Sequence, residues 1–167
     1  MSSERDRERS DKMIWSELDS RLIAVSMDAD TKDGILERMG GRFVELGYCK
    51  SSYIQALKDR EVEFPTGIDI DGVGVAMPHT DVSHVNRAGI GIATLKEPVT
   101  FIHMATDDTP VPVRVVFMLA VDDPGRHLEK IQDILAVIQD KKALEKIITA
   151  ENAEEIISII KEKENLQ

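Results

Sequence analysis

An almost unbroken apolar run, VPVRVVFMLAV at residues 111–121, constrains the fold more than any other feature of this 167-residue sequence. A strand with one solvated face alternates apolar and polar residues, whereas this run places apolar side chains on both faces. It therefore predicts the central strand of a sheet that other elements cover on both sides.

A helix is expected to follow this strand directly. In DDPGRHLEKIQDILAVI, residues 122–138, Asp123 is a natural N-cap and Pro124 suits the first helical position. His127 then falls in or just after the first turn, where unpaired backbone N–H groups and the helix dipole favour an anion. The spacing of apolar residues predicts one stripe along this helix, formed by Leu128, Ile131, Leu135 and Ile138.

The residues before the central strand predict further strands and helices. RLIAVSM at residues 21–27 has the pattern of a strand, and Asp30 or Thr31 can cap a helix that ends at Gly47. A shorter helix is expected to start near Ser51. GVGVAM and AGIGIATL are predicted strands with glycine and alanine on one face, which favours close approach of a helix or loop there; bulges or turns at these glycines are the alternative.

The remaining pattern completes a single α/β domain. KKALEKIITAENAEEIISIIKEK, residues 141–163, predicts one short and one longer amphipathic helix. We therefore expect residues 13–167 to form a central mixed β-sheet with helices on both sides. Residues 1–12 alternate charges without apolar periodicity and are expected to be a disordered, solvated tail.

Charge and hydropathy exclude two classes of partner. The formal net charge of −10 repels polyanions, so nucleic acid is not expected to bind. No apolar run approaches the roughly 20 residues that cross a bilayer, so we expect a cytoplasmic protein without direct membrane insertion. The single cysteine, Cys49, is interpreted as a small structural residue.

The candidate functional residues are histidines, because an imidazole with its pKa of about 6.5 can be a nucleophile, a proton carrier or a metal ligand. His79 follows a predicted strand and His127 lies where the central strand passes into a helix. Sites collect at the carboxyl ends of strands in α/β sheets. If these two strands run parallel and lie close, the two imidazoles can meet. His84 and His103 are expected to be ordinary structural residues.

Several other chemistries lack their sequence signatures. A zinc site needs three or four closely spaced ligands, yet no Cys pair or His-Glu-x-x-His helix is present. The Gly-x-Ser-x-Gly turn of serine hydrolases and the Gly-x-x-x-x-Gly-Lys phosphate loop are also missing. We therefore predict no metal and no cofactor, and a histidine nucleophile that accepts a phosphoryl group, with Arg60 as the candidate guanidinium beside it.

Several motifs in the same order resemble a known family. GYC, LKDRE, FPTGI, GVGVAMPH and DDPGRHLEKIQDI lie between about Thr31 and Leu135. This segment resembles the enzyme IIA domains of the fructose-mannitol superfamily in the bacterial phosphoenolpyruvate-dependent sugar phosphotransferase system. The stretch FIHMATDDTPVPVRVVFMLAV is most similar to the galactitol-type branch.

The resemblance implies a phosphotransferase that works as a phosphohistidine relay. By this analogy His79 accepts a phosphoryl group from the carrier protein HPr and donates it to a cysteine of a IIB component, with a membrane IIC component downstream. His127 would hydrogen-bond the phosphoryl oxygens or the acceptor imidazole, Arg60 would neutralise charge, and Thr66 is a weaker candidate for a polar contact. These residues do not identify the transported sugar.

The same resemblance leaves a second function open. A regulatory module could use the same fold, become phosphorylated at His79, and bind a transcription factor or kinase according to its phosphorylation state. The sequence alone does not separate transport from regulation, because one histidine could serve both.

Overall fold

The centre of the molecule is a five-stranded mixed sheet, seen in a computed structural model that describes residues 13–165. The predicted tail at residues 1–12 lies outside the described residues. The strands are β1 (Leu18–Met27), β2 (Ile68–Ile70), β3 (Val73–Ala76), β4 (Gly89–Ile102) and β5 (Pro110–Ala120). Their order is β1-β4-β5-β3-β2, and β5 runs parallel to β3 but antiparallel to β4.

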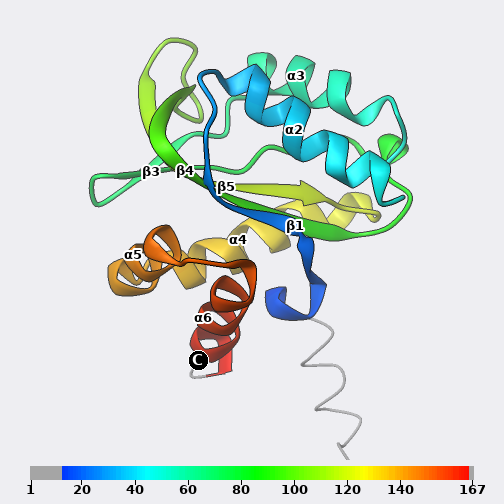
Figure 1. Ribbon diagram of the computed structural model, residues 1–167. Coiled ribbons are helices and arrows are strands. Elements are labelled where there is room, and N and C mark those ends of the chain that lie inside the picture. The colour runs from blue at the N-terminus through cyan, green and yellow to red at the C-terminus, as the bar shows by residue number, and fades with distance from the viewer. Residues whose placement is uncertain (1–12, 166–167) are drawn as a thin grey trace, which may run out of the picture.

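Helices cover both faces of this sheet (Figure 1). α2 (Lys32–Glu45) and α3 (Tyr53–Glu63) lie on one face, and α4 (His127–Ile138), α5 (Lys141–Thr149) and α6 (Ala153–Asn165) lie on the other. Three short 3-10 turns complete the order: η1 (Ile14–Glu17), η2 (Val82–His84) and η3 (Pro124–Arg126). The predicted α/β domain with a doubly covered sheet is confirmed. No helix within residues 13–165 has the length and apolar character needed to cross a membrane.

β5 is the middle strand, as its apolar run predicts. Val116 and Met118 pack into the core under α2 and α3, whereas Val115, Phe117 and Leu119 pack into the core against α4, α5 and α6. Each of these five side chains is at most 1% exposed. The strand is continuously apolar because it contributes to two cores at once.

The small-residue face of β4 lies against aromatic rings. A Cβ atom on Gly89 would lie 2.7 Å from the Tyr48 ring, and one on Gly91 would lie 2.8 Å from the Phe43 ring. Close approach is therefore the reason for these two glycines. At Gly74 in β3 the nearest atoms belong instead to the backbone of β5, so a neighbouring strand, and not a helix, excludes a side chain there.

The predicted helix boundaries follow from capping chemistry. The Thr31 hydroxyl accepts a hydrogen bond from the N–H of Gly34 at 3.0 Å, and Gly47 has a φ of +83° just beyond α2. The Asp123 carboxylate accepts one from the N–H of Gly125 at 3.0 Å. Thr31 and Gly47 bound α2 as the sequence predicts, whereas Asp123 caps the 3-10 turn η3 and not α4 itself.

The predicted apolar stripe of α4 is wrong at its start. Pro124 begins the 3-10 turn η3, and the α-helix proper begins at His127. Leu128 is 66% exposed. The buried face instead follows Lys130, Ile134, Val137 and Ile138. A charged residue at the start of this face makes it hard to recognise, because sequence patterns assign lysine to the solvent side.

Cys49 occupies a buried position at the end of the turn that follows α2. Its side chain is 3% exposed, and its residue forms an isolated β-bridge with Val85. Burial raises the pKa of the Cys49 thiol to about 12. A thiol that stays protonated is a poor nucleophile, so its surroundings are those of a structural residue.

Candidate functional site

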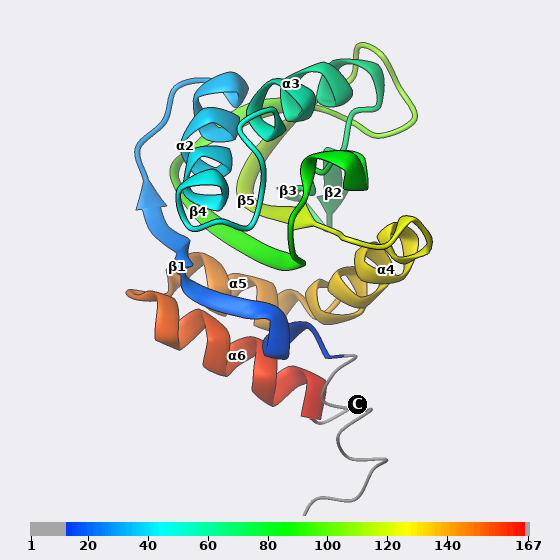
Figure 2. The same cartoon turned by 90° about the vertical axis from the view of Figure 1, so that its right-hand side faces the viewer.

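The carboxyl ends of β3 and β5 bring His79 and His127 together. The two strands are parallel neighbours, with Ala76 paired to Val116. The ring centroids of the two histidines are 5.4 Å apart, and the ring planes are inclined by 36°. In Figure 2 the end of β5, the turn η2 and the start of α4 lie on the same side of the molecule. The condition stated from the sequence, parallel and close strands, is therefore met.

Backbone hydrogen bonds hold the His79 segment in place. The N–H of Leu119 in β5 donates to the carbonyl oxygen of Pro78 at 2.9 Å. His79 Nδ1 lies 2.9 Å from the carbonyl oxygen of Met77. Because a carbonyl oxygen only accepts, Nδ1 carries the proton, and Nε2 is left as the ring nitrogen with a free lone pair.

His127 is oriented by the same loop. Its Nε2 lies 3.1 Å from the carbonyl oxygen of Thr80, one residue after His79, and therefore donates to it. The opposite ring nitrogen, Nδ1, remains available to another group. The two histidines thus present different nitrogens: Nε2 of His79 and Nδ1 of His127.

The surroundings keep the His79 ring neutral. Burial lowers the pKa of His79, and the nearby positive charges of His127 and Arg60 lower it further. The hydrogen bond to the Met77 carbonyl acts in the opposite direction. A neutral imidazole with a free Nε2 lone pair is the form that can attack phosphorus.

Arg60 lies in the last turn of α3, and its positive charge helps to lower the pKa of His79. Its Nη1 is 3.8 Å from Oδ1 of Asp81, and its guanidinium carbon lies 4.9 Å from the centre of the Phe64 ring. The ion pair is weak, since its two charged atoms are 3.8 Å apart and the Asp81 side chain is 75% exposed. Nε is buried without a hydrogen-bond partner in the described part of the chain.

Thr66 does not point into the histidine site. Its side chain is buried, and its hydroxyl donates to the carboxylate of Glu61 at 2.9 Å while accepting from the N–H of Met77 at 3.1 Å. Glu61 is not among the site residues predicted from the sequence. It follows Tyr53 and Leu57 at a spacing of four on the buried face of α3, where an apolar residue is expected, and this misplaced charge is the signal that could have found it.

The other two histidines have separate partners. Nδ1 of His84 lies 2.8 Å from the hydroxyl of Ser52, and Nδ1 of His103 lies 2.8 Å from the carbonyl oxygen of Met104. Neither ring contacts His79 or His127 among the residues described. No group of three or more His, Cys, Asp or Glu side chains in residues 13–165 has the arrangement of a metal site.

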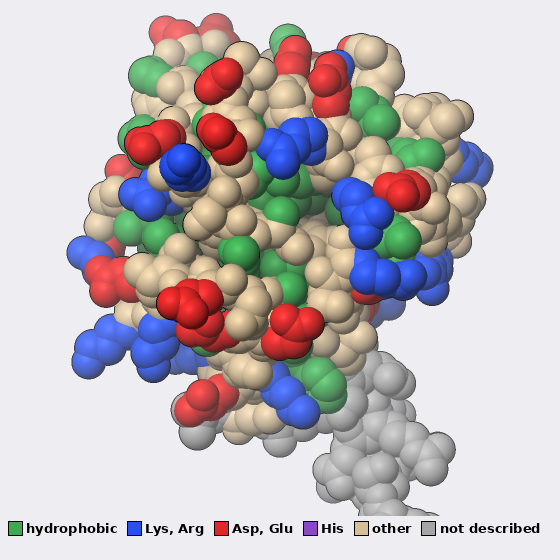
Figure 3. Space-filling model, in the orientation of Figure 1, with side chains coloured by type: hydrophobic (Ala, Val, Ile, Leu, Met, Phe, Trp, Pro, Cys, Tyr) green, Lys and Arg blue, Asp and Glu red, His purple; other side chains and the backbone are tan. Residues whose placement is uncertain are grey.

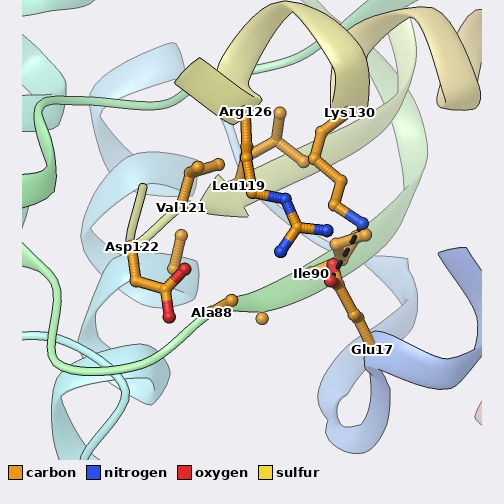
Figure 4. A pocket seen from close by; sticks show the side chains of 10 residues that line it. Glu17, Ala88, Ile90, Leu119, Val121, Asp122, Arg126 and Lys130 are labelled. Atoms are coloured by element: carbon orange, nitrogen blue, oxygen red, sulfur yellow. Dashed lines mark ion pairs between the residues drawn. The ribbon is translucent and has the colours of Figure 1, made fainter. Parts of the chain in front are cut away.

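Behind the start of α4 lies a small pocket with mixed charges (Figure 4). Lys130 is 3% exposed, and its Nζ lies 2.9 Å from a carboxylate oxygen of Glu17 in η1. Arg126 and Asp122 also line the pocket. The ion pair ties η1 to the helix that carries His127, and it compensates the buried charge of Lys130.

Removing one partner of this pair should destabilise the protein strongly. We expect Lys130→Ala to lower the free energy of unfolding by about 3–5 kcal/mol, because Glu17 would be left without its counter-charge. The control is Lys163→Ala, whose ion pair with Asp140 is more exposed, for which about 1 kcal/mol or less is expected. Urea unfolding measures both. Equal losses in the two variants would contradict the structural role of the buried pair.

The sequence of this chain matches a known protein family and several known proteins. The family model for "Phosphoenolpyruvate-dependent sugar phosphotransferase system, EIIA 2" matches residues 17–163. The galactitol-specific EIIA component of Escherichia coli is 31% identical over 115 residues, which cover 69% of this chain and 76% of that protein. The mannitol-specific enzyme IIA component of Staphylococcus aureus is 30% identical over 141 residues, covering 84% and 92%.

Solved structures share the fold. The nitrogen regulatory protein IIA-Ntr of Neisseria meningitidis is 26% identical with a TM-score of 0.72, and the match covers 88% of this chain and 98% of that one. A complex of enzyme IIA mannitol with phosphorylated enzyme IIB mannitol from Escherichia coli contains a chain that is 22% identical, with a TM-score of 0.72 and coverage of 86% and 96%.

Proposed function

Because the chain belongs to the EIIA type 2 family of the phosphoenolpyruvate-dependent sugar phosphotransferase system, we propose that it is a phosphocarrier with His79 as the phosphoryl acceptor. The observation that carries this proposal is the geometry of the His79 ring, with Nδ1–H on the Met77 carbonyl, Nε2 free, and the His127 ring 5.4 Å away. The proposed donor is HPr and the proposed acceptor is a IIB component.

The first transfer follows from the free nitrogen of His79. The Nε2 lone pair attacks the phosphorus of the phosphohistidine of HPr, an N–P bond forms, and the N–P bond to the HPr imidazole breaks. In the second transfer a IIB thiolate attacks the same phosphorus, and the His79 N–P bond breaks with its electron pair returning to Nε2. No water takes part, so the phosphoryl group is passed on and not lost.

Two neighbouring groups stabilise the phosphoryl group in this scheme. His127 can donate from Nδ1 to a phosphoryl oxygen when that nitrogen carries a proton, while Nε2 keeps its bond to Thr80. Arg60 supplies a second positive charge from α3. The Thr80 carbonyl holds the His127 ring before the reaction, so little reorganisation of this group is needed when charge develops.

Exposed apolar side chains beside the site fit transient docking of the protein partners. Leu128 follows His127 and is 66% exposed, and Phe64 lies against the Arg60 guanidinium and is 53% exposed. On the face of Figure 1, by contrast, acidic and basic side chains are interspersed and no histidine is seen (Figure 3). The proposed docking surface therefore lies on another side, around the histidine pair.

Replacing Leu128 should weaken docking without unfolding the protein. Leu128→Ser is expected to raise the KM for phospho-HPr about tenfold, because the exposed apolar contact is lost, and to leave the free energy of unfolding within about 0.5 kcal/mol. Initial phosphorylation rates at several HPr concentrations measure the effect. An unchanged KM would remove Leu128 from the docking surface.

The direct test of the proposed function uses the intact protein. Incubation with phosphoenolpyruvate, enzyme I and HPr should add one phosphoryl group, seen as a mass increase, and a cognate IIB component should then remove it. The modification should be labile in acid and stable in alkali, as expected for phosphorus on an imidazole nitrogen. No mass increase with active HPr would refute the proposal.

For the downstream route we propose uptake of a sugar or sugar alcohol, galactitol-like, through a membrane IIC component, with this chain acting in the cytoplasm. The galactitol-specific relative supports this substrate class. A second candidate is a regulatory module, favoured by the likeness to a nitrogen regulatory protein at 26% identity. Transfer to a IIB cysteine supports transport, whereas phosphorylation by HPr without transfer to any IIB component supports regulation.

A further inference from the structure

The buried carboxyl group of Glu61 begins a chain of hydrogen bonds that ends on the His79 ring. The N–H and the hydroxyl of Thr66 both donate to Oε1 of Glu61 at 2.9 Å. The same hydroxyl oxygen accepts from the N–H of Met77 at 3.1 Å. The carbonyl oxygen of Met77 then accepts from Nδ1–H of His79 at 2.9 Å. Helix α3 is thus linked to the proposed acceptor through a loop and a strand end.

Chemistry fixes the direction of these bonds. In its ionised form the Glu61 carboxylate only accepts, so the hydroxyl hydrogen of Thr66 then points to Glu61 and a lone pair of its oxygen faces the N–H of Met77. Met77 is therefore held by the bond on its N–H, while its carbonyl oxygen sets the tautomer of His79. Because Met77 is 1% exposed, no solvent competes for this backbone.

Burial of the Glu61 carboxyl group is unfavourable if packing is its only role. Its side chain is 3% exposed, and among residues 13–165 it has no ion pair, only a longer-range interaction with the charge of Lys32. Burial raises the pKa of the Glu61 carboxyl to about 7, although the hydrogen bonds from Thr66 lower it. A leucine would suit the stripe that continues from Tyr53 and Leu57, so the carboxyl has a use other than burial.

We propose that Glu61 and Thr66 are positioning residues for His79, which hold the Met77 backbone so that Nδ1 stays protonated and Nε2 stays free. Neither residue touches the phosphoryl group in this arrangement. The effect on transfer rests on the acceptor role proposed for His79, whereas the effect on the tautomer does not.

The test removes the Thr66 hydroxyl and compares the effect with that of removing another buried hydroxyl. Thr66→Val keeps the side-chain shape, and Thr66→Ser keeps the hydroxyl. The matched control is Thr94→Val, because Thr94 is 1% exposed and its hydroxyl accepts from the N–H of Ser26 at 2.9 Å. This contact joins β4 to the edge strand β1, away from β3 and His79. Ring ¹⁵N chemical shifts of His79 in the unphosphorylated protein report its tautomer, and the phosphorylation rate with phospho-HPr reports transfer.

The expected result separates Thr66→Val from both other variants. We expect Thr66→Val to populate the Nε2–H tautomer of His79 and to slow phosphorylation about 10- to 100-fold, since small displacements of a reacting group have effects of this size. Thr66→Ser and Thr94→Val should keep the wild-type tautomer and rate. If Thr66→Val does not fold, Glu61→Leu replaces it, because leucine removes the acceptor of both Thr66 bonds, and a tautomer shift in the same direction is expected.

Two results would overturn the proposal. One is a wild-type tautomer in the folded Thr66→Val or Glu61→Leu variant. The other is equal slowing in Thr66→Val and Thr94→Val, which would indicate a general loss of stability. If the wild-type protein accepts no phosphoryl group at all, the proposed function fails, but the ring ¹⁵N shifts still decide whether Glu61 and Thr66 position His79.

Discussion

Replacing His79 with alanine should abolish phosphorylation while the protein stays folded. The variant removes the free Nε2, the proposed nucleophile, so no covalent route remains. Its structural cost is small, because the ring is only half-buried and donates one hydrogen bond, a loss of about 1 kcal/mol. Intact-mass measurement after incubation with phosphoenolpyruvate, enzyme I and HPr, together with thermal unfolding, checks both expectations.

His84→Ala is the matched control for this prediction. His84 also lies in the segment that follows β3, but its ring bonds to the Ser52 hydroxyl and has no contact with His127 among the described residues. The His84→Ala variant should be phosphorylated at the wild-type rate. A folded His79→Ala protein that still gains a phosphoryl group would show that another residue is the acceptor.

The pH dependence of the wild-type rate should follow the lowered pKa of His79. Since burial and the neighbouring cations lower this pKa below 6.5, the ring is still mostly neutral at pH 6.5. The nucleophile is lost only when the pH falls through the folded-state pKa. The acceptance rate should therefore decline below pH 6.5, at a lower pH than for an unperturbed imidazole.

The sheet and its two covered faces were predictable because residue types report burial directly. β5 is apolar on both faces and lies at the centre, and the glycines of β4 mark the approach of Phe43 and Tyr48. The start of α4 was not predictable in the same way. Lys130 is buried by an ion pair with Glu17, which lies 113 positions away in sequence, and no local pattern reports such a partner.

The histidine pair was predictable only as a condition. Strand-end positions selected His79 and His127, but the sequence does not state that β3 and β5 are parallel neighbours. Arg60 could be chosen by its neighbouring motif, whereas Glu61 beside it was overlooked. Its importance depends on the loop that brings Thr66 to the end of β3, and that is a tertiary contact.

Replacing His127 should slow phosphorylation without moving the phosphoryl group to another residue. His127 is placed to donate from Nδ1 and to add charge, and it does not need to form a covalent bond. Loss of one preorganised donor of this kind typically lowers a rate by about 10²- to 10³-fold. We therefore expect His127→Ala to become phosphorylated at His79 more slowly by this factor, measured by rapid quenching and intact mass.

His127→Gln distinguishes hydrogen bonding from charge. Its amide can donate a hydrogen bond but cannot titrate, so it should recover part of the rate and flatten any limb of the pH profile that belongs to His127. The His79→Ala/His127→Gln double variant should accept no phosphoryl group. Wild-type rates in both single variants would reduce His127 to a helix-start residue that only anchors the Thr80 carbonyl, and phosphate found on His127 itself would reverse the roles of the two histidines.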